Sequence, residues 1–278
     1  MGVAKAVSKD TGWSAYLGLG FKRSPGKTVL ARRERSGPLA VQRPFYPEGD
    51  VCHVYLLHPP GGVAGGDKLQ IEADLAAGSH ALVTTPGATK FYRSGGPAAH
   101  QTQRLKVAEG ASLEWMPQEN IFFPGAQVHM NTRVELEGGA RLALWETHCL
   151  GRPVIEEAFD KGSLDARLEI WRDKKPLMVE RLRVNPISRA RSSLLNGQPV
   201  SATAVFSHAQ EKHLQIARDQ IQQHDNRIAG ATLIEDLLVV RYLGDSTEQA
   251  RKLFSNIWIV LRESLLQRPA SIPRIWHT

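Results

Sequence analysis

The stretch that decides the fold is Leu105–Trp115, LKVAEGASLEW. Apolar residues alternate with polar ones on both sides of Gly110, which is typical of two half-buried strands joined by a tight glycine turn. Similar units occur at Leu69–Val83 and at Val134–Leu144, each with its own turn glycine. Successive turn glycines are roughly 30 residues apart, a period that indicates stacked supersecondary units.

We therefore predict a mainly β fold, in which β-layers stack along a solenoid-like, β-helical path. Three ordinary hairpins in a β-sandwich are the alternative. Arg167–Val184 predicts a further hairpin, which turns at the sequence DKKP. A few helices are expected, concentrated in the C-terminal third: one over Ser207–Gln223 and one that starts at Ser246 and stops before Pro269.

The same patterns predict the organisation of the chain. Residues 1–12 are expected to form a disordered extension, followed by a single domain over 13–278. Within that domain we expect a β-rich layered part over 13–188 and a helix/strand/helix part over 200–278. The best candidate for a flexible link between the two is Arg189–Ser201, which contains the turn sequence NGQP.

Composition narrows the class of protein. Apolar residues make up 42% and charged residues 23%, as in ordinary globular proteins, and no apolar run approaches the ~20 residues of a membrane helix. Only Cys52 and Cys149 are present, and the N-terminus lacks the shape of an export signal, so we expect a cytoplasmic protein. The net charge is +7, but acids interrupt the basic clusters, so neither nucleic acid nor membrane is expected as a partner.

The segment His58–Asp67, HPPGGVAGGD, suggests a phosphate-binding loop at first sight. Gly61 and Gly66 have the P-loop separation, but Asp67 stands where that loop needs lysine and would repel a phosphate. No helix start follows, so no helix dipole would face an anion. We expect these glycines to serve the backbone geometry instead.

Two spots combine possible metal ligands: Cys52-His53 and the segment Glu146-Thr-His148-Cys149. Residues two apart on a strand share a face, so Glu146 and His148 would lie together while Cys149 points away. Nickel accepts carboxylate, imidazole and thiolate ligands, so His148 and Cys149 are candidates for transient metal contact. The residues alone favour a buried structural cysteine and a hydrogen-bonded histidine. A metal-dependent hydrolase using Glu146 and His148 is the rival function, but it needs a third ligand and an open coordination position.

Several segments resemble one known family. They are SGPLAVQRPFYPE (36–48), HPPGGVAGGD (58–67), TTPGATKFYRS (84–94), LEWMPQENIFFPGA (113–126), CLGRP (149–153) and PRIWHT (273–278). They are similar to motifs of the urease accessory protein family UreD, called UreH in some bacteria, and occur in the family's order. The resemblance runs from Trp13 to Thr278.

The resemblance implies a function that the residues alone do not. UreD proteins are scaffolds, not enzymes: they dock on apo-urease and bind UreF, which recruits the GTPase UreG carrying nickel. The family's fold is mainly β, in stacked layers with a few helices. An internal passage has been proposed to carry nickel, so nickel would be in transit and no cofactor tightly bound. Mapped by motif, the expected passage residues are Asp67, Thr84, Lys90, Glu119 and Glu146.

Overall fold

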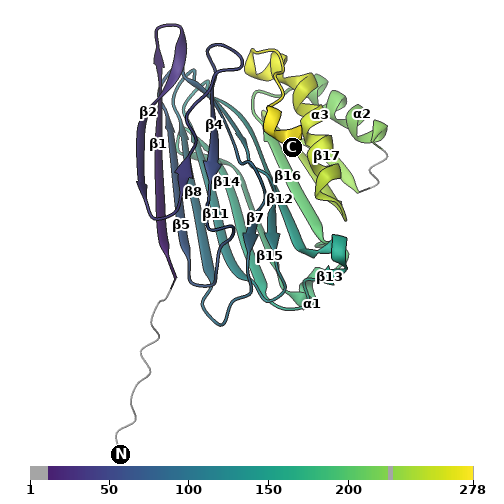
Figure 1. The fold of residues 1–278 in the computed structure, drawn as a ribbon. Coiled ribbons are helices and arrows are strands. Elements are labelled where there is room, and N and C mark those ends of the chain that lie inside the picture. The colour runs from purple at the N-terminus through teal and green to yellow at the C-terminus, as the bar shows by residue number, and fades with distance from the viewer. Residues whose placement is uncertain (1–11, 225–227, 278) are drawn as a thin grey trace, which may run out of the picture.

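The computed structural model describes residues 12–224 and 228–277, which form two β-sheets and a helical layer (Figure 1). The seven-stranded first sheet has the order β15 (Lys175–Val184), β14 (Ser163–Arg172), β11 (Gln127–Leu136), β8 (Ala99–Val107), β5 (Lys68–Leu75), β1 (Ser14–Ser24) and β2 (Lys27–Ser36). The main path of the second sheet is β17 (Ala229–Ile234), β18 (Leu237–Gly244), β16 (Val200–Phe206), β12 (Arg141–Arg152), β9 (Ser112–Met116), β6 (His80–Thr84), β4 (Cys52–Leu57) and β3 (Ala40–Val41). Short strands β7 (Thr89–Phe91), β10 (Asn120–Phe122) and β13 (Glu157–Ala158) lie off this path.

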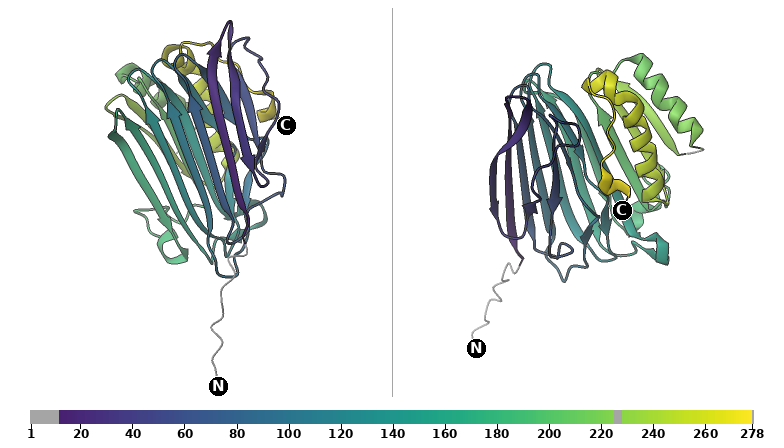
Figure 2. Two further views of the ribbon diagram at one scale, coloured as in Figure 1. Left: turned by 90° about the vertical axis from the view of Figure 1, so that its left-hand side faces the viewer. Right: turned by 45° about the horizontal axis from the view of Figure 1, so that its top comes forward.

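The chain follows a solenoid-like path through these sheets, as the repeat predicts. Each coil runs along the first sheet, turns at a glycine and continues in the second sheet, so β5 leads to β6, β8 to β9 and β11 to β12 (Figure 2). The two strands of a unit pair with the next coil and not with each other: β5 pairs in parallel with β8, and β6 with β9. The hairpin alternative for these units is therefore wrong.

Glycine is required at the turns between the sheets. Gly78, Gly110 and Gly138 have φ angles of 67°, 67° and 45°, a left-handed backbone that side chains with a Cβ rarely adopt. In the third unit, where two glycines are adjacent, Gly138 and not Gly139 has the positive φ angle. The turns also stack, because the Gly78 amide donates to the carbonyl of Glu109 in the next coil.

The predicted hairpin at the DKKP turn is confirmed. Strands β14 and β15 pair in antiparallel fashion from Leu164–Val184 to Arg172–Lys175. Asp173 and Lys174 at the turn have φ angles of 49° and 66°. Two successive positive φ angles are typical of the tight turns that match the twist of a two-stranded hairpin.

Helices α2 (Glu211–Gln223) and α3 (Thr247–Leu266) cover the outer face of the second sheet (Figure 1). Ser246 caps the start of α3, since its hydroxyl accepts from the Gln249 amide at 3.2 Å. Helix α2 starts later than expected, because Ser207 still bonds to Leu142 at the end of β16. The remaining helical elements are α1 (Pro186–Arg189), η1 (Pro153–Ile155) and η2 (Arg274–His277).

Two hydrophobic cores result from this layering. The first lies between the sheets and the second between the second sheet and the helices. Strand β12 belongs to both: Leu142 and Leu144 point into the first core, and Ala143 and Trp145 into the second. Because both faces are covered, ten of its twelve residues are buried.

The last third of the chain shares a sheet with the layered part, since β16 pairs with β12 from Ala143–Phe206 to Cys149–Val200. The predicted extension over 1–12 lies outside the described residues except for Gly12. Among the residues that the structure describes, no helix is both long and apolar enough to cross a membrane.

Candidate functional site

Glu146 is a buried acid between the two sheets. It lies on β12 in line with Leu142 and Leu144, and only 8% of it is exposed. Across the gap, the hydroxyl of Thr132 on β11 donates to Glu146 Oε1 at 2.5 Å. Burial raises the pKa of Glu146 to about 7, and the Thr132 hydrogen bond opposes that rise only in part. The carboxyl therefore changes charge near neutral pH.

Strand register extends this contact into two facing rows of side chains. On the second sheet Glu146 is the register partner of Thr203, which in turn pairs with Arg241. On the first sheet the row is Gln103, Thr132, Leu168 and Glu180. We call the polar members of both rows the polar corridor: Gln103, Thr132, Glu180, Glu146, Thr203 and Arg241. It runs across the strands from the buried Glu146 to the edge of the first sheet at β15.

Two cavities share Glu146 as a lining residue. The first has a volume of about 310 Å³, and its polar lining includes Lys90, Gln101, Gln103 and Asn120. The second has a volume of about 290 Å³ and is lined by His148, Glu180 and Arg241, among others. Glu146 lines both.

Buried polar atoms in the linings lack protein partners. They are Oε1 of Gln103 and Nε1 of Trp115 in the first cavity, and Nδ1 of His148 in the second. Buried polar atoms are costly to leave without a hydrogen bond, so both spaces suit water or a polar guest.

His148 and Cys149 lie on opposite faces of β12, as alternation requires. Nε2 of His148 is 3.8 Å from Oε2 of Glu146, and burial lowers the pKa of His148 to about 4, so its imidazole is neutral and able to coordinate a metal. Cys149 belongs to the helix-covered core, and burial followed by the charge of Glu119 raises its pKa to about 12. One ion cannot contact both side chains.

The structure brings together only some of the residues expected along a passage. Glu146 and Lys90 line the first cavity, whereas Asp67, Thr84 and Glu119 are absent from the linings of both. Thr84 faces the helical layer, where its hydroxyl donates to the Met116 carbonyl at 2.6 Å.

Asp67 completes the glycine loop. Its carboxylate accepts from the amides of Trp13 and Ala64, both at 2.8 Å. Gly61 and Gly66 have φ angles of 80° and 92°, so the loop uses glycine for backbone geometry. The residue after Asp67 begins strand β5 and not a helix.

Sequence reasoning missed most of the polar corridor, namely Gln103, Thr132, Thr203, Glu180 and Arg241. One local signal was available: Gln103 and Thr132 occupy inward positions of strands whose other inward residues are mostly apolar. That these strands stand opposite Glu146 depends on how the two sheets face each other.

The hydrolase alternative requires a third ligand beside Glu146 and His148. In residues 12–224 and 228–277, no group of three or more His, Cys, Asp or Glu side chains is arranged to hold a metal ion. The described residues therefore do not supply the third ligand that the hydrolase alternative requires.

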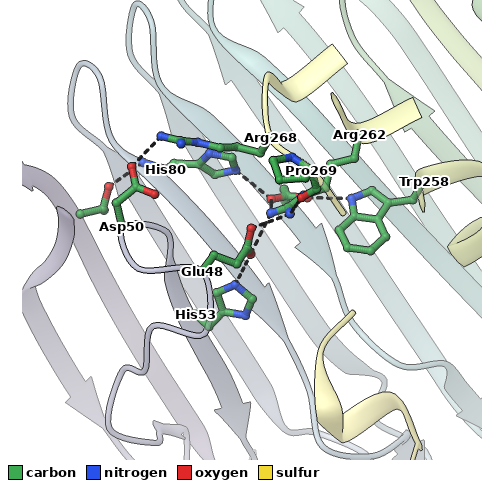
Figure 3. A network of polar contacts seen from close by, with 10 residues as sticks. Glu48, Asp50, His53, His80, Trp258, Arg262, Arg268 and Pro269 are labelled. Carbon is green, nitrogen blue, oxygen red and sulfur yellow. Dashed lines mark hydrogen bonds and ion pairs between the residues drawn. The ribbon is translucent and has the colours of Figure 1, made fainter. Parts of the chain in front are cut away.

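A second concentration of charge lies on the other face of the second sheet (Figure 3). Arg262 of α3 is fully buried and donates to Glu114 at 2.8 and 3.0 Å and to Glu48 at 2.5 and 2.9 Å. His80 lies 2.8 Å from Glu114, and His53 lies 2.6 Å from Glu48. Both acids are fully engaged by protein groups and line neither cavity, so this network joins α3 to the strands.

Comparison with known proteins finds one family model and a set of relatives with the same name, and both match almost the whole chain. The sequence model described as "UreD urease accessory protein" matches residues 14–277. Proteins named "Urease accessory protein UreD" are similar to it: 49% identical in Alcanivorax borkumensis, over 99% of this chain and 96% of that protein, and 48% in Pseudomonas entomophila, over 97% and 96%. The protein of that name from Klebsiella aerogenes is 46% identical over 96% of this chain and 97% of its own length.

Proposed function

The chain belongs to the UreD family of urease accessory proteins, and from that premise we propose that it is a non-enzymatic scaffold that assists nickel delivery to apo-urease. In this proposal it works in the cytoplasm and binds UreF, through which it reaches the GTPase UreG. Nickel is the cargo and passes through the polar corridor and the two cavities that share Glu146 as a lining residue. Family membership supports the role in urease maturation; the partners and the route are our proposal.

The observation that carries the proposal is the position of Glu146. It is the lining residue common to both cavities, so an ion that moved between them would pass its carboxylate. A buried carboxylate lowers the energy of a cation there, and a neutral imidazole from His148 adds a ligand that nickel accepts. Weak contacts in sequence let an ion leave as readily as it enters.

The attraction of Glu146 for a cation depends on the protonation state of its carboxyl. Because its pKa is about 7, the carboxyl carries a proton for part of the time at neutral pH, and an arriving cation would favour the ionised form. Acidification below pH 7 would keep the carboxyl neutral and remove its attraction for the ion.

The test is Glu146→Gln, which keeps shape and the acceptor for Thr132 but cannot ionise. We expect the variant to fold and to join UreF and urease, while urease produced with it contains less nickel and is less active. Glu169→Gln is the matched control, since Glu169 is only 4% exposed but binds Arg133 and Arg167 and lines neither cavity. Normal nickel loading with Glu146→Gln would remove this residue from the route, and loss of the complex would make its role structural.

A further inference from the structure

An ion pair that bridges the two sheets closes the outer end of the polar corridor. Nη2 of Arg241 on β18 donates to Oε1 of Glu180 on β15. Strand β15 is the edge of the first sheet, and both side chains line the second cavity together with Glu146. The side chains of Arg241 and Glu180 are 46% and 30% exposed, so the pair lies where the corridor meets solvent.

We propose that Arg241 is a resident counter-cation, and that a divalent cation enters or leaves the second cavity by displacing its guanidinium from Glu180. The proposal rests on the proposed function, because it takes the corridor to be the route of nickel. With Arg241 in place, Glu180 is neutralised and the guanidinium repels a second cation. When Arg241 swings toward solvent, the Glu180 carboxylate becomes available to the ion.

The exposure of the pair makes such an exchange easy. Ion pairs at this level of exposure contribute a factor of about five or less to an equilibrium, because water screens them and the long side chains lose freedom. The pair is therefore weak enough to open. By contrast, Arg262 is enclosed with two buried acids and would stay in place.

Register supports a role along the corridor. Arg241 stands in the same cross-strand row as Thr203 and Glu146, and Glu180 in the row of Leu168 and Thr132. Two hydrogen bonds thus cross between the rows, Thr132 to Glu146 inside and Arg241 to Glu180 outside. An ion released from one carboxylate would meet the next along the same line.

The test measures Ni²⁺ binding to the full chain by equilibrium dialysis. Arg241→Met removes the competing cation, so we expect binding about two- to fivefold tighter than in the wild type. Arg241→Lys keeps the charge and should bind like the wild type, and Glu180→Gln should bind more weakly. Arg152→Met is the control, because Arg152 pairs with Glu157 at a similar exposure of 40% and 36% and lines neither cavity.

Thermal unfolding of the same variants distinguishes two roles of the Arg241–Glu180 pair: exchange of Arg241 for a divalent cation, and a purely structural contact between the sheets. Unchanged Ni²⁺ binding by Arg241→Met, with a lowered Tm, would overturn the proposal and make the pair a brace between sheets. The nickel route itself is tested by urease loading with Glu146→Gln. If Glu146→Gln reduces the nickel content of urease but Arg241→Met leaves Ni²⁺ binding unchanged, the proposed displacement of Arg241 is refuted and the nickel route is not. Normal loading with Glu146→Gln would refute the route, whatever Arg241→Met does.

Discussion

Replacing Arg262 by Met should strongly destabilise the protein, although Arg262 lines neither cavity. The substitution keeps a long, unbranched side chain but removes the cation shared by Glu114 and Glu48. The side chain of Glu114 is fully buried and that of Glu48 is 8% exposed, so neither carboxylate can be solvated in exchange. Removing one member of a buried ionic cluster costs about 3–5 kcal/mol, and we expect a loss in that range.

Trp258 does not replace the lost cation. Its indole N–H already donates to Glu114 Oε2 at 2.7 Å, and His80 already contacts Oε1. A second substitution should recover part of the loss: Arg262→Met combined with Glu114→Gln removes one of the two uncompensated charges and leaves only that of Glu48.

The pH dependence gives an independent check. Burial by itself raises the pKa of Glu114, but the hydrogen bond from His80 and the charge of Arg262 outweigh it and lower the pKa to about 2. A carboxyl with a lowered folded-state pKa contributes stability above its unfolded pKa and loses it as pH falls toward the folded value. Without Arg262 this contribution shrinks, so the difference between wild type and variant should narrow between pH 6 and pH 3.

The assay is equilibrium unfolding in urea at several pH values, with Arg268→Met as the control. Arg268 lies just beyond the same helix and donates to Asp50 at 2.6 Å, but its side chain is 41% exposed, so its loss should cost less than about 1 kcal/mol. A cost below about 1 kcal/mol for Arg262→Met, or a difference that stays constant with pH, would refute this account of the network.

Other variants test the remaining features. Glu146→Gln should be more stable than the wild type at pH 8 by roughly 3 kcal/mol, because the raised pKa of Glu146 costs folding free energy once pH exceeds the unfolded value; unfolding at pH 4 should show almost no difference. Gly66→Val should lose roughly 1–3 kcal/mol because φ at this position is 92°, and neither protein should bind ATP or GTP at micromolar affinity, which dialysis can check. Trp276→Ala should lower the Tm, since this ring packs against two tryptophans in the second core and donates to Thr84 at 3.2 Å; an unchanged Tm would show that the tail is not part of the core. Co-expression with UreF should yield a soluble complex, which co-elution tests.

Because Trp276 packs into the second core, deletion of the C-terminal segment is a poor test of whether this segment contacts a partner. The segment from Ile272 onward contains both an exposed side chain, Ile272 at 42%, and the buried Trp276 at 7%. Deleting the segment would therefore unfold part of the core and remove surface at once. Substitution of exposed residues such as Ile272 and Val260 would leave the core intact, so a loss of UreF binding in these variants could be distinguished from a loss of folding.

The alternation of apolar and polar residues, together with the turn glycines, was sufficient to predict the solenoid-like path of the chain. Alternation on either side of Gly110 specifies strands, and the positive φ of a glycine turn redirects the chain between sheets. The repeat then aligns each strand with its equivalent one coil later, as in the pairing of Leu69 with Gln101. The same parity placed Glu146 and His148 on one face of β12 and Cys149 on the other.

Which face of a strand meets the corridor was decided by tertiary structure alone. All residues of β6 are buried, because it lies between the first sheet and the helical layer, so alternation could not show that Thr84 faces the helices. Glu180 and Arg241 are 61 residues apart in sequence and belong to different sheets, yet they touch because the edge of one sheet lies over β18 of the other. Strand propensity and period act over a few residues, whereas the juxtaposition of two sheets depends on every coil between them. The chain by itself determined the strands and the acid at Glu146; only packing decided what that acid faces.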